Sequence, residues 1–389
     1  MAVIPPNASW HYFGMGFKDS TLAKDKLAAC LVNIRGTDFE DGNEIETETD
    51  QGHTGTSNLD MGSYRKNATS APTWEDGLRY SEGLEDYWYG LLGKVTKTAH
   101  LDDNEDPVDG VYDYAFEQAD EGVDLPLATI YNGFQKTTTD ARVWNNAMIN
   151  EFECTFSNED LPKVNPTWIS DYNNFNLINP TRSYREPSIF VKAPQTQVYI
   201  GAVGATAEEM LANPIDCFTE ASFSINQNAE DQACHADNFG VNTKMMGARE
   251  TTGSITMPWT DATKYLETEY EAYDKYGHIV SEDITNKQVW FVAGGKNIFV
   301  EDAETHEMVD TGVAYNTTIK FAEVEVTSVT SPKSGEDAKD LTLEFKVLEK
   351  PSQSYMTVDM VTDLSALHID DTGITLASLY PSGEPFNGN

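Results

Sequence analysis

The segment INEFECTF, residues 149–156, decides the fold class, because polar and apolar side chains alternate along it with a period of two residues. Successive side chains of a β-strand point to opposite faces, so this pattern is typical of a strand with one buried and one exposed face. Phe152 and Cys154 are expected to face a core, and Glu151 and Glu153 to face solvent.

The same alternation recurs along most of the chain, and Gly, Asn, Asp and Pro residues separate the alternating segments. The pattern therefore predicts a mainly β protein with few helices. The expected strands are 27–34, 44–50, 128–131, 149–156, 218–225, 254–257, 287–293, 318–326 and 341–348.

Two segments have helical spacing instead. The first runs from Ser81, a suitable N-cap, to Gly93, which can end a helix in a left-handed conformation. The second has Thr260 or Asp261 as its cap, and Gly277 lies beyond its end. Each presents an apolar stripe that is expected to pack on a sheet, consisting of Leu84, Tyr87, Trp88 and Leu91 in the first and Leu266, Tyr270 and Tyr273 in the second.

The order of strands and helices suggests an internal repeat. Each predicted helix is followed by a strand and then by a Glu-apolar-Glu-apolar-Thr segment, at 151–155 and at 323–327. We therefore predict two tandem domains, residues 1–190 with an N-terminal arm and a long loop at 36–72, and residues 191–389 with a C-terminal extension. Chance similarity between two short strands is the alternative.

The chain has 389 residues with 64 Asp and Glu against 26 Lys and Arg, a formal net charge of −38. Residues 1–200 carry −17 and residues 201–389 carry −21, so no acidic tail accounts for the charge. Such a surface repels DNA and anionic membranes, which excludes nucleic-acid binding through a basic patch. The alternative is that the charge serves only solubility or adaptation to a salty medium. Residues 1–10 show no export signal, and no apolar run is long enough to span a membrane.

Three of the expected strands place several carboxylates on one face. A row of like charges on a strand is unfavourable for stability, so these residues are the candidate functional side chains. They are Glu44, Glu46 and Glu48 on the first strand, Glu151 and Glu153 on the second, and Glu323 and Glu325 on the third.

Catalytic motifs are not found, and we expect no enzyme activity, no cofactor and no metal site. Asp102, Asn104 and Asp106 imitate the start of a calcium-binding loop, but Pro107 replaces the required Gly, so only a loose surface calcium site stays open. The four cysteines are far apart and are expected to be reduced thiols. They are Cys30, Cys154, Cys217 and Cys234.

Three segments of the second half carry a resemblance to a known family. They are FTEASFSIN at 218–226, GARETTGSITM at 247–257 and VWFVAGG at 289–295. In this order, with the expected helix at 260–277 between the last two, they resemble the major tail tube proteins of long-tailed, siphovirus-like phages. The first half fits more weakly. The whole arrangement is similar to those tail proteins that carry two fused tube domains in one chain.

This resemblance implies two tandem tail-tube-type β-sandwich or β-barrel domains, each with one α-helix packed on the sheet. It implies stacked rings of three chains with pseudo-sixfold symmetry, in which the acidic strands line a conduit for genome ejection. The implied partners are further copies of the chain, the tape measure protein, the tail terminator and tail-tip proteins, and viral DNA that passes without specific binding. The implied location is the virion tail, assembled in the host cytoplasm, with no membrane contact.

Two other classes are compatible with the sequence. One is another β-rich virion or surface adhesion protein, which predicts independent monomeric domains. The other is an acidic carbohydrate-active enzyme, which requires an aromatic-lined cleft with two positioned carboxylates. The oligomeric state separates the tube protein from both.

Overall fold

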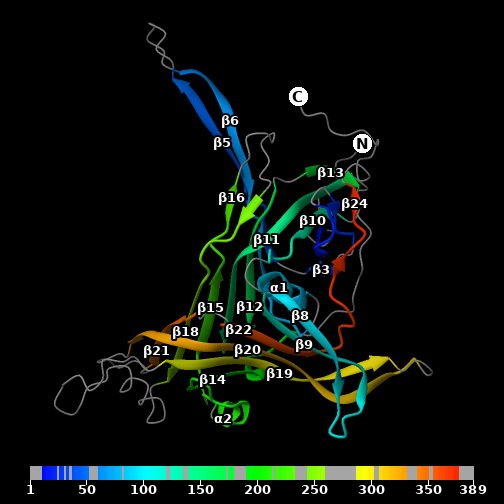
Figure 1. The fold of residues 1–389 in the computed structure, drawn as a ribbon, viewed down its shortest axis with the longest axis vertical. Helices are drawn as coiled ribbons and strands as arrows, with labels where there is room; N and C mark the ends of the chain where they lie inside the picture. Colours follow the sequence, from blue (N-terminus) through cyan, green and yellow to red (C-terminus); the bar gives the residue numbers. More distant parts are fainter. Residues whose placement is uncertain are drawn as a thin grey trace, which may run out of the picture.

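A computed structural model describes the parts of the chain from which the fold is derived. The described residues are 11–23, 26–29, 32–34, 37–51, 60–80, 83–119, 123–134, 139–171, 174–178, 190–212, 214–215, 217–232, 243–258, 286–301, 306–330, 340–349 and 354–375. The molecule is mainly β, as the alternation predicts, and its sheets are largely antiparallel (Figure 1).

One antiparallel set of strands comes from residues 11–178, and we call it the first strand set. In this set β1 pairs with β10, and β10 pairs with β11. The N-terminal half of β11 also pairs with β13, and its C-terminal half pairs with β12. β12 continues to β7, and β7 to β4. The bounds are β1 (His11–Lys18), β4 (Thr37–Glu40), β7 (Thr73–Gly77), β10 (Ala128–Phe134), β11 (Thr139–Ser157), β12 (Lys163–Ile169) and β13 (Asn174–Ile178).

The second strand set, from residues 196–362, has the same pairing order. In this set β14 pairs with β19, and β19 pairs with β20. β20 also pairs with β22 and with β21. β21 continues to β18, and β18 to β15. The bounds are β14 (Thr196–Ala202), β15 (Glu220–Asn226), β18 (Glu250–Pro258), β19 (Lys287–Glu301), β20 (Met308–Thr330), β21 (Asp340–Val347) and β22 (Met356–Thr362).

The two strand sets also share their irregularities. In β11, two residues between Trp144 and Ala147 face a single residue of β10; in β20, two residues between Phe321 and Val324 face a single residue of β19. A second bulge precedes Glu151 in β11 and Ser328 in β20. Corresponding positions at the two bulges lie 177 residues apart (324 − 147 and 328 − 151).

The two sets join into one eight-stranded sheet, because β11 pairs with β15 over seven residue pairs. Its order is β4-β7-β12-β11-β15-β18-β21-β20. The long strands β11 and β20 leave this sheet through their N-terminal halves and enter the sheets that hold β10 and β19. Strand pairing thus runs across the predicted boundary at 190/191, and the division into two domains stays a prediction.

Hairpins are inserted at corresponding places in the two sets. β5 (Asn43–Gln51) and β6 (Asp60–Ser70) lie between β4 and β7, and β16 (Glu230–Gln232) and β17 (Thr243–Met245) lie between β15 and β18. Figure 1 shows β5 and β6 projecting far from the body of the molecule. A third hairpin, β8 (Gly93–Leu101) with β9 (Pro107–Gln118), extends the second set by pairing β9 with β22.

The first predicted helix is present as α1 (Leu84–Leu92), and its four stripe residues are all buried. Gly93 ends it in a left-handed conformation with φ 84°, as predicted, and its N–H donates to the Tyr89 carbonyl. At the N-terminus the cap is Gly83, and the expected cap Ser81 lies outside the described residues. The second predicted helix, 260–277, also lies outside them. α2 (Ala207–Leu211) and the 3-10 turn Ala193–Gln195 are the other short helical elements of the described chain.

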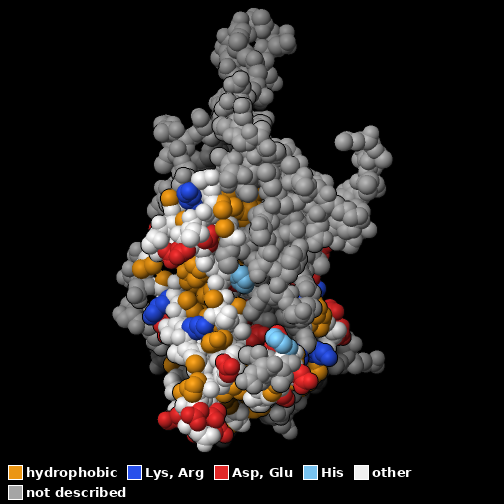
Figure 2. Space-filling model, turned by 90° about the vertical axis from the view of Figure 1, so that its right-hand side faces the viewer, with side chains coloured by type: hydrophobic (Ala, Val, Ile, Leu, Met, Phe, Trp, Pro, Cys, Tyr) orange, Lys and Arg blue, Asp and Glu red, His pale blue; other side chains and the backbone are white. Residues whose placement is uncertain are grey.

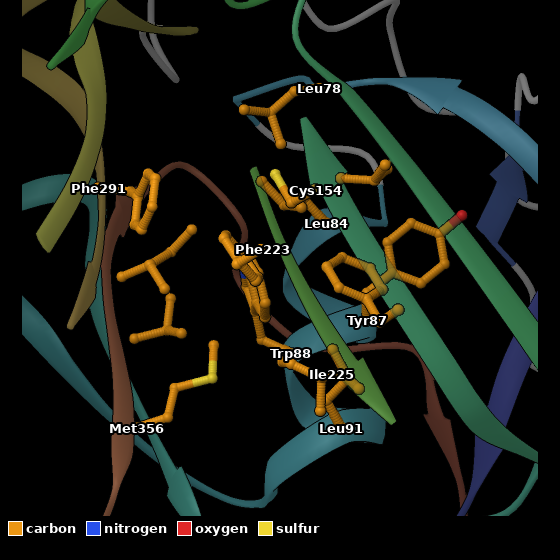
Figure 3. Packing of buried hydrophobic residues seen from close by; sticks show 14 of the residues in the cluster. Leu78, Leu84, Tyr87, Trp88, Leu91, Cys154, Phe223, Ile225, Phe291 and Met356 are labelled. Carbon is orange, nitrogen blue, oxygen red and sulfur yellow. The ribbon is translucent and has the colours of Figure 1, made fainter. Parts of the chain in front are cut away.

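A single large core joins the two strand sets (Figure 3). Trp88 of α1 meets Phe152 edge-on at 5.1 Å between ring centroids. Phe156 of the first set stacks on Phe291 of the second at 5.4 Å, and Phe291 in turn lies beside Phe223 at 5.3 Å. Burial of each such ring stabilises the fold by about 2 kcal/mol, so the two sets support each other.

The chain after β22 returns to the first strand set, and we call residues 363–375 the C-terminal strap. β23 (Ile369–Asp370) pairs in parallel with β1, and β24 (Ile374–Thr375) pairs with β2 (Lys26–Leu27). The remaining short strand, β3 (Val32–Ile34), also pairs with β1. The predicted strand 27–34 is therefore wrong as one element, since β2 and β3 are separate strands with different partners.

Asp370 holds the strap by accepting hydrogen bonds from backbone N–H groups of Ala29, Thr372 and Gly373 and from the Thr372 hydroxyl. Burial raises the pKa of this carboxyl, but the hydrogen bonds together lower the pKa to below its ordinary value. Its contribution to stability is therefore complete above the unfolded pKa and is lost as the pH falls through the folded pKa. We expect Asp370→Asn to lower the Tm at pH 5. The variant should also show a smaller drop in Tm between pH 5 and pH 3 than the unmodified chain. Asp371→Asn, at an exposed neighbour, should follow the unmodified chain; equal pH dependence of all three would contradict this role.

Candidate functional site

One face of the eight-stranded sheet is polar along all eight strands, while the other face forms the core. We call it the polar face. It carries many Ser and Thr side chains together with eleven charged ones. The charged residues are Glu40, Glu75, Glu151, Glu153, Glu220, Glu250, Glu325, Asp340, Glu344, Lys163 and Lys346.

Strand register places these side chains in rows across the sheet. Residues directly opposite each other on neighbouring strands share a face, with Cβ atoms about 5 Å apart. One such row runs from the first strand set into the second through the β11–β15 junction. Its members are Asn165, Glu153, Ser224, Thr252, Lys346 and Glu325.

Cations neutralise only part of the acidic charge. The Lys163 ammonium lies 3.0 Å from Glu75, and the hydrogen bond to that carboxylate raises the pKa of Lys163. The Lys346 ammonium lies 2.9 Å from Glu250. With nine carboxylates and two ammonium groups, the polar face has a formal charge of −7 (2 − 9). An extended surface of this sign repels anionic polymers.

Neutral donors hold two of the remaining carboxylates in place. Asn226 donates to Glu151 at 3.0 Å across the β11–β15 junction, and the Ser328 hydroxyl donates to Glu344 at 2.7 Å. Such contacts orient the carboxylates without cancelling their charge, so the polar face stays negative.

Three of the seven sequence-predicted residues lie on the polar face. Glu151 and Glu153 are exposed, and Phe152 and Cys154 between them are buried, as the alternation predicts. Glu325 lies opposite Lys346 on the same face. Burial also raises the pKa of the Cys154 thiol, so this cysteine stays protonated.

The prediction for Glu323 is wrong. Glu323 is only 6 % exposed, and Asn286 donates a hydrogen bond of 2.6 Å to its carboxylate. The reason is the bulge between Phe321 and Val324, which adds one residue to β20 and reverses the alternation there. Glu323 and Glu325 therefore do not share a face.

Glu44, Glu46 and Glu48 lie on β5, which pairs with β6 as a separate hairpin outside the eight-stranded sheet. Glu44 is exposed, and the side chains of Glu46 and Glu48 are outside the described part of the chain. The structure therefore does not bring these three residues together with Glu151 and Glu153.

Sequence reasoning missed six carboxylates of the polar face. None of them forms a Glu-x-Glu pair. Their signal is alternation with buried neighbours, as for Glu344 between Leu343 and Phe345. The six are Glu40, Glu75, Glu220, Glu250, Asp340 and Glu344.

The turn between β8 and β9 holds the candidate calcium-binding residues. The Asp102 carboxylate accepts backbone hydrogen bonds from Asn104 at 2.8 Å and Asp106 at 2.9 Å, which lowers its pKa and uses its oxygens within the turn. Figure 2 shows acidic side chains gathered at the lower end of one face, where this turn lies in Figure 1. Within the described ranges, no group of three or more His, Cys, Asp or Glu residues could hold a metal ion.

No helix among the described residues is long and apolar enough to cross a membrane. The sequence matches no protein-family model and shows no significant similarity to a curated protein.

Proposed function

We propose that this protein is the major tail tube subunit of a long-tailed phage, with two fused tube domains in one chain. Three chains form a ring of six domains, and rings stack into a hollow tube. The observation that carries the proposal is the eight-stranded sheet, in which the same four-strand order occurs twice and one face is continuously polar and acidic.

The repeated pairing order supports duplication. Both bulges of β11 recur in β20, each 177 residues later in the chain (324 − 147 and 328 − 151). A shared pair of bulges is a stronger sign of common ancestry than two short similar segments. The alignment also differs from the sequence expectation, because Glu151 corresponds to Ser328 and not to Glu323. We therefore assign one tube domain to each strand set.

The acidic polar face suits the lumen of such a tube. Double-stranded DNA carries one negative charge per about 1.7 Å of its axis, and proteins that bind it do so by neutralising phosphates with Lys and Arg. A wall with a formal charge of −7 per chain (2 − 9) leaves DNA without such contacts, so the genome can slide. The tape measure protein occupies this lumen during assembly in the host cytoplasm.

The projecting hairpins suit contacts between rings. β5–β6 and β16–β17 are inserted at corresponding places, and Figure 1 shows both in the upper half of the molecule. A ring of three chains would present six such hairpins toward its neighbour. The end rings would meet the tail terminator and tail-tip proteins.

Charge reversal on the polar face tests this proposal. The triple variant Glu151→Lys, Glu153→Lys and Glu325→Lys changes the formal charge of the face from −7 to −1, since each substitution adds two positive charges. We expect hollow rods to form, because all three side chains point away from the core. DNA ejection from particles with this subunit should be slowed at least tenfold at low salt and recover as salt screens the lysines.

The matched control reverses three exposed carboxylates of the β8–β9 hairpin, Asp103, Glu105 and Asp109. Its net charge equals that of the first variant, and it should eject DNA normally. Normal DNA ejection by particles with the polar-face variant would contradict the assignment of that face to the lumen. Monomers at every concentration and no rods in electron microscopy, with tip complexes present as initiators, would overturn the tube function itself.

A further inference from the structure

A lysine, an asparagine and an aspartate meet beside the first residues of β10. The Lys18 ammonium donates to Oδ1 of Asn146 at 2.7 Å, and Nδ2 of Asn146 donates to Oδ2 of Asp171 at 2.7 Å. Lys18 is only 4 % exposed, and the other two residues are half-buried. None of the three belongs to the polar face, so the proposed function does not use them.

The strands position each of the three residues. Lys18 ends β1, and its backbone N–H donates to the Leu127 carbonyl just before β10. Asn146 lies in the first bulge of β11, in a left-handed conformation with φ 48°. Asp171 follows β12, and its backbone N–H donates to the Asn145 carbonyl at 3.1 Å. Bulges re-aim side chains and are frequent next to active sites, so this placement of Asn146 suits a chemical role.

The two hydrogen bonds fix the orientation of the Asn146 amide. In their ionised forms Lys18 can only donate and Asp171 can only accept, so the amide oxygen faces the lysine and the amide nitrogen faces the aspartate. A nitrogen 2.7 Å from Oδ1 lies within about 4 Å of Cγ, because the C=O bond is about 1.2 Å long. Nucleophilic attack starts from separations of about 3–3.5 Å. The lysine nitrogen is thus close to an electrophilic carbon, and the aspartate contacts the nitrogen that would leave.

We infer that Lys18 and Asn146 join in an intramolecular isopeptide bond, with Asp171 as the catalytic acid and base. This inference goes beyond the proposed function and does not depend on it. The chain supplies every reacting group, since the amine, the amide and the proton carrier are all side chains of the cluster.

The proton transfers balance within the cluster. Asp171 takes one proton from the Lys18 ammonium, which leaves both groups neutral, the state that burial favours. The electron pair of Nζ then forms a bond to Cγ of Asn146, and the π electrons of the C=O bond move to Oδ1. Asp171 gives its proton to Nδ2 and takes another from Nζ, while the Cγ–Nδ2 bond breaks and the C=O bond re-forms. The last proton passes from Asp171 to the released ammonia, so the products are a secondary amide, a carboxylate and an ammonium ion.

The bond ties β1 to β11 across β10, which lies between them in the sheet. Lys18 and Asn146 are 128 positions apart in the chain, so the bond closes a long loop. A cross-link of this kind restricts the unfolded chain and thereby stabilises the folded one. β1 also pairs with β23, so the C-terminal strap is held by a strand that is itself covalently anchored.

Mass spectrometry of the purified full chain tests the bond. Loss of ammonia makes the chain lighter by about 17 Da than its sequence mass. Succinimide formation at an Asn-Gly step causes the same loss, so tandem mass spectrometry of the tryptic peptides decides between them. Trypsin does not cleave after an acylated lysine. We therefore expect a branched peptide in which residues 143–163 are joined through Lys18 to residues 1–24.

Variants assign the roles of the three residues. Lys18→Arg and Asn146→Ala should abolish the branched peptide, because each removes one of the two groups that react. Asp171→Asn keeps the size of the side chain and should lower the linked fraction by about tenfold or more. Lys94→Arg and Glu117→Gln change a lysine–carboxylate pair elsewhere in the chain, at 2.7 Å, and are the matched controls that should keep the branched peptide.

Each outcome is decisive for the bond. Separate peptides 1–18 and 143–163 from the folded, unmodified chain would overturn it and leave the three side chains as a hydrogen-bonded cluster. A branched peptide that persists at full yield in Asp171→Asn would overturn the catalytic role of Asp171. Neither result affects the proposed tube function, which the rods and DNA ejection test separately.

Discussion

Replacing Asp86 with alanine is expected to lower the free energy of unfolding by about 3 kcal/mol, because it removes a buried carboxylate that makes hydrogen bonds with both the backbone and the ring of His368. Asp86 lies on α1 and has 1 % of its side chain exposed; its carboxylate is 2.9 Å from Nδ1 of His368 and accepts the His368 backbone N–H at 2.8 Å. The change leaves both His368 groups buried without this acceptor. Denaturant titration measures the loss.

The Asp86 contact also fastens the C-terminal strap, so Asp86→Ala should expose the strap to proteases. Limited proteolysis followed by mass spectrometry is expected to show cleavage within residues 363–375 before any other described segment. Asp371→Ala, at an exposed position of the same strap, is the matched control and should change neither readout. A loss below 1 kcal/mol, with the strap still resistant, would show that the pair does not anchor it.

Local pattern was sufficient to predict the elements whose environment is regular. Period-two alternation predicted the buried and exposed sides of β11 at 151–154, because a regular strand repeats every two residues. Helical spacing similarly predicted the buried face of α1 and its end at Gly93. Both are properties of consecutive residues.

Bulges explain where the same reasoning failed. The prediction for Glu323 assumed an unbroken strand, and the extra residue between Phe321 and Val324 turned Glu323 into the protein. That bulge depends on the pairing of β20 with β19, which no local pattern reveals. For the same reason the two similar segments, 151–155 and 323–327, are not structurally equivalent. The bulges align Glu151 with Ser328, five residues after Glu323 (328 − 323).

The composition of the polar face could be predicted only in part. Its acidic character is visible in the paired carboxylates of β11, but single ones such as Glu220 and Glu250 join it only through strand order. β11 meets β15 across more than 60 residues of sequence (220 − 157). Such long-range pairing is set by the whole core and not by either strand alone.

Gly253→Val is expected to cost about 3 kcal/mol or more, because the position has no room for a side chain. Gly253 lies on β18 between Phe223 of β15 and Phe345 of β21. A Cβ atom there would lie 2.3 Å from Cζ of Phe345 and 2.7 Å from the Ser222 backbone oxygen. One contact is a buried ring and the other is main chain of the same sheet, so either the core or the strand pairing must shift.

A double-mutant comparison separates the two contacts of Gly253. Gly253→Ala should lose about 1–3 kcal/mol, and adding Phe345→Leu should recover part of this loss by removing the ring, although the contact with Ser222 remains. Thr252→Ala, on the exposed side of the same strand, is the control and should stay within about 0.5 kcal/mol of the unmodified chain. If Gly253→Ala cost as little as Thr252→Ala, the close approach of Phe345 and the Ser222 backbone to Gly253 would not be needed for stability. The glycine of the segment GARETTGSITM thus has a physical reason: it lets β15, β18 and β21 pack Phe345 beneath the polar face.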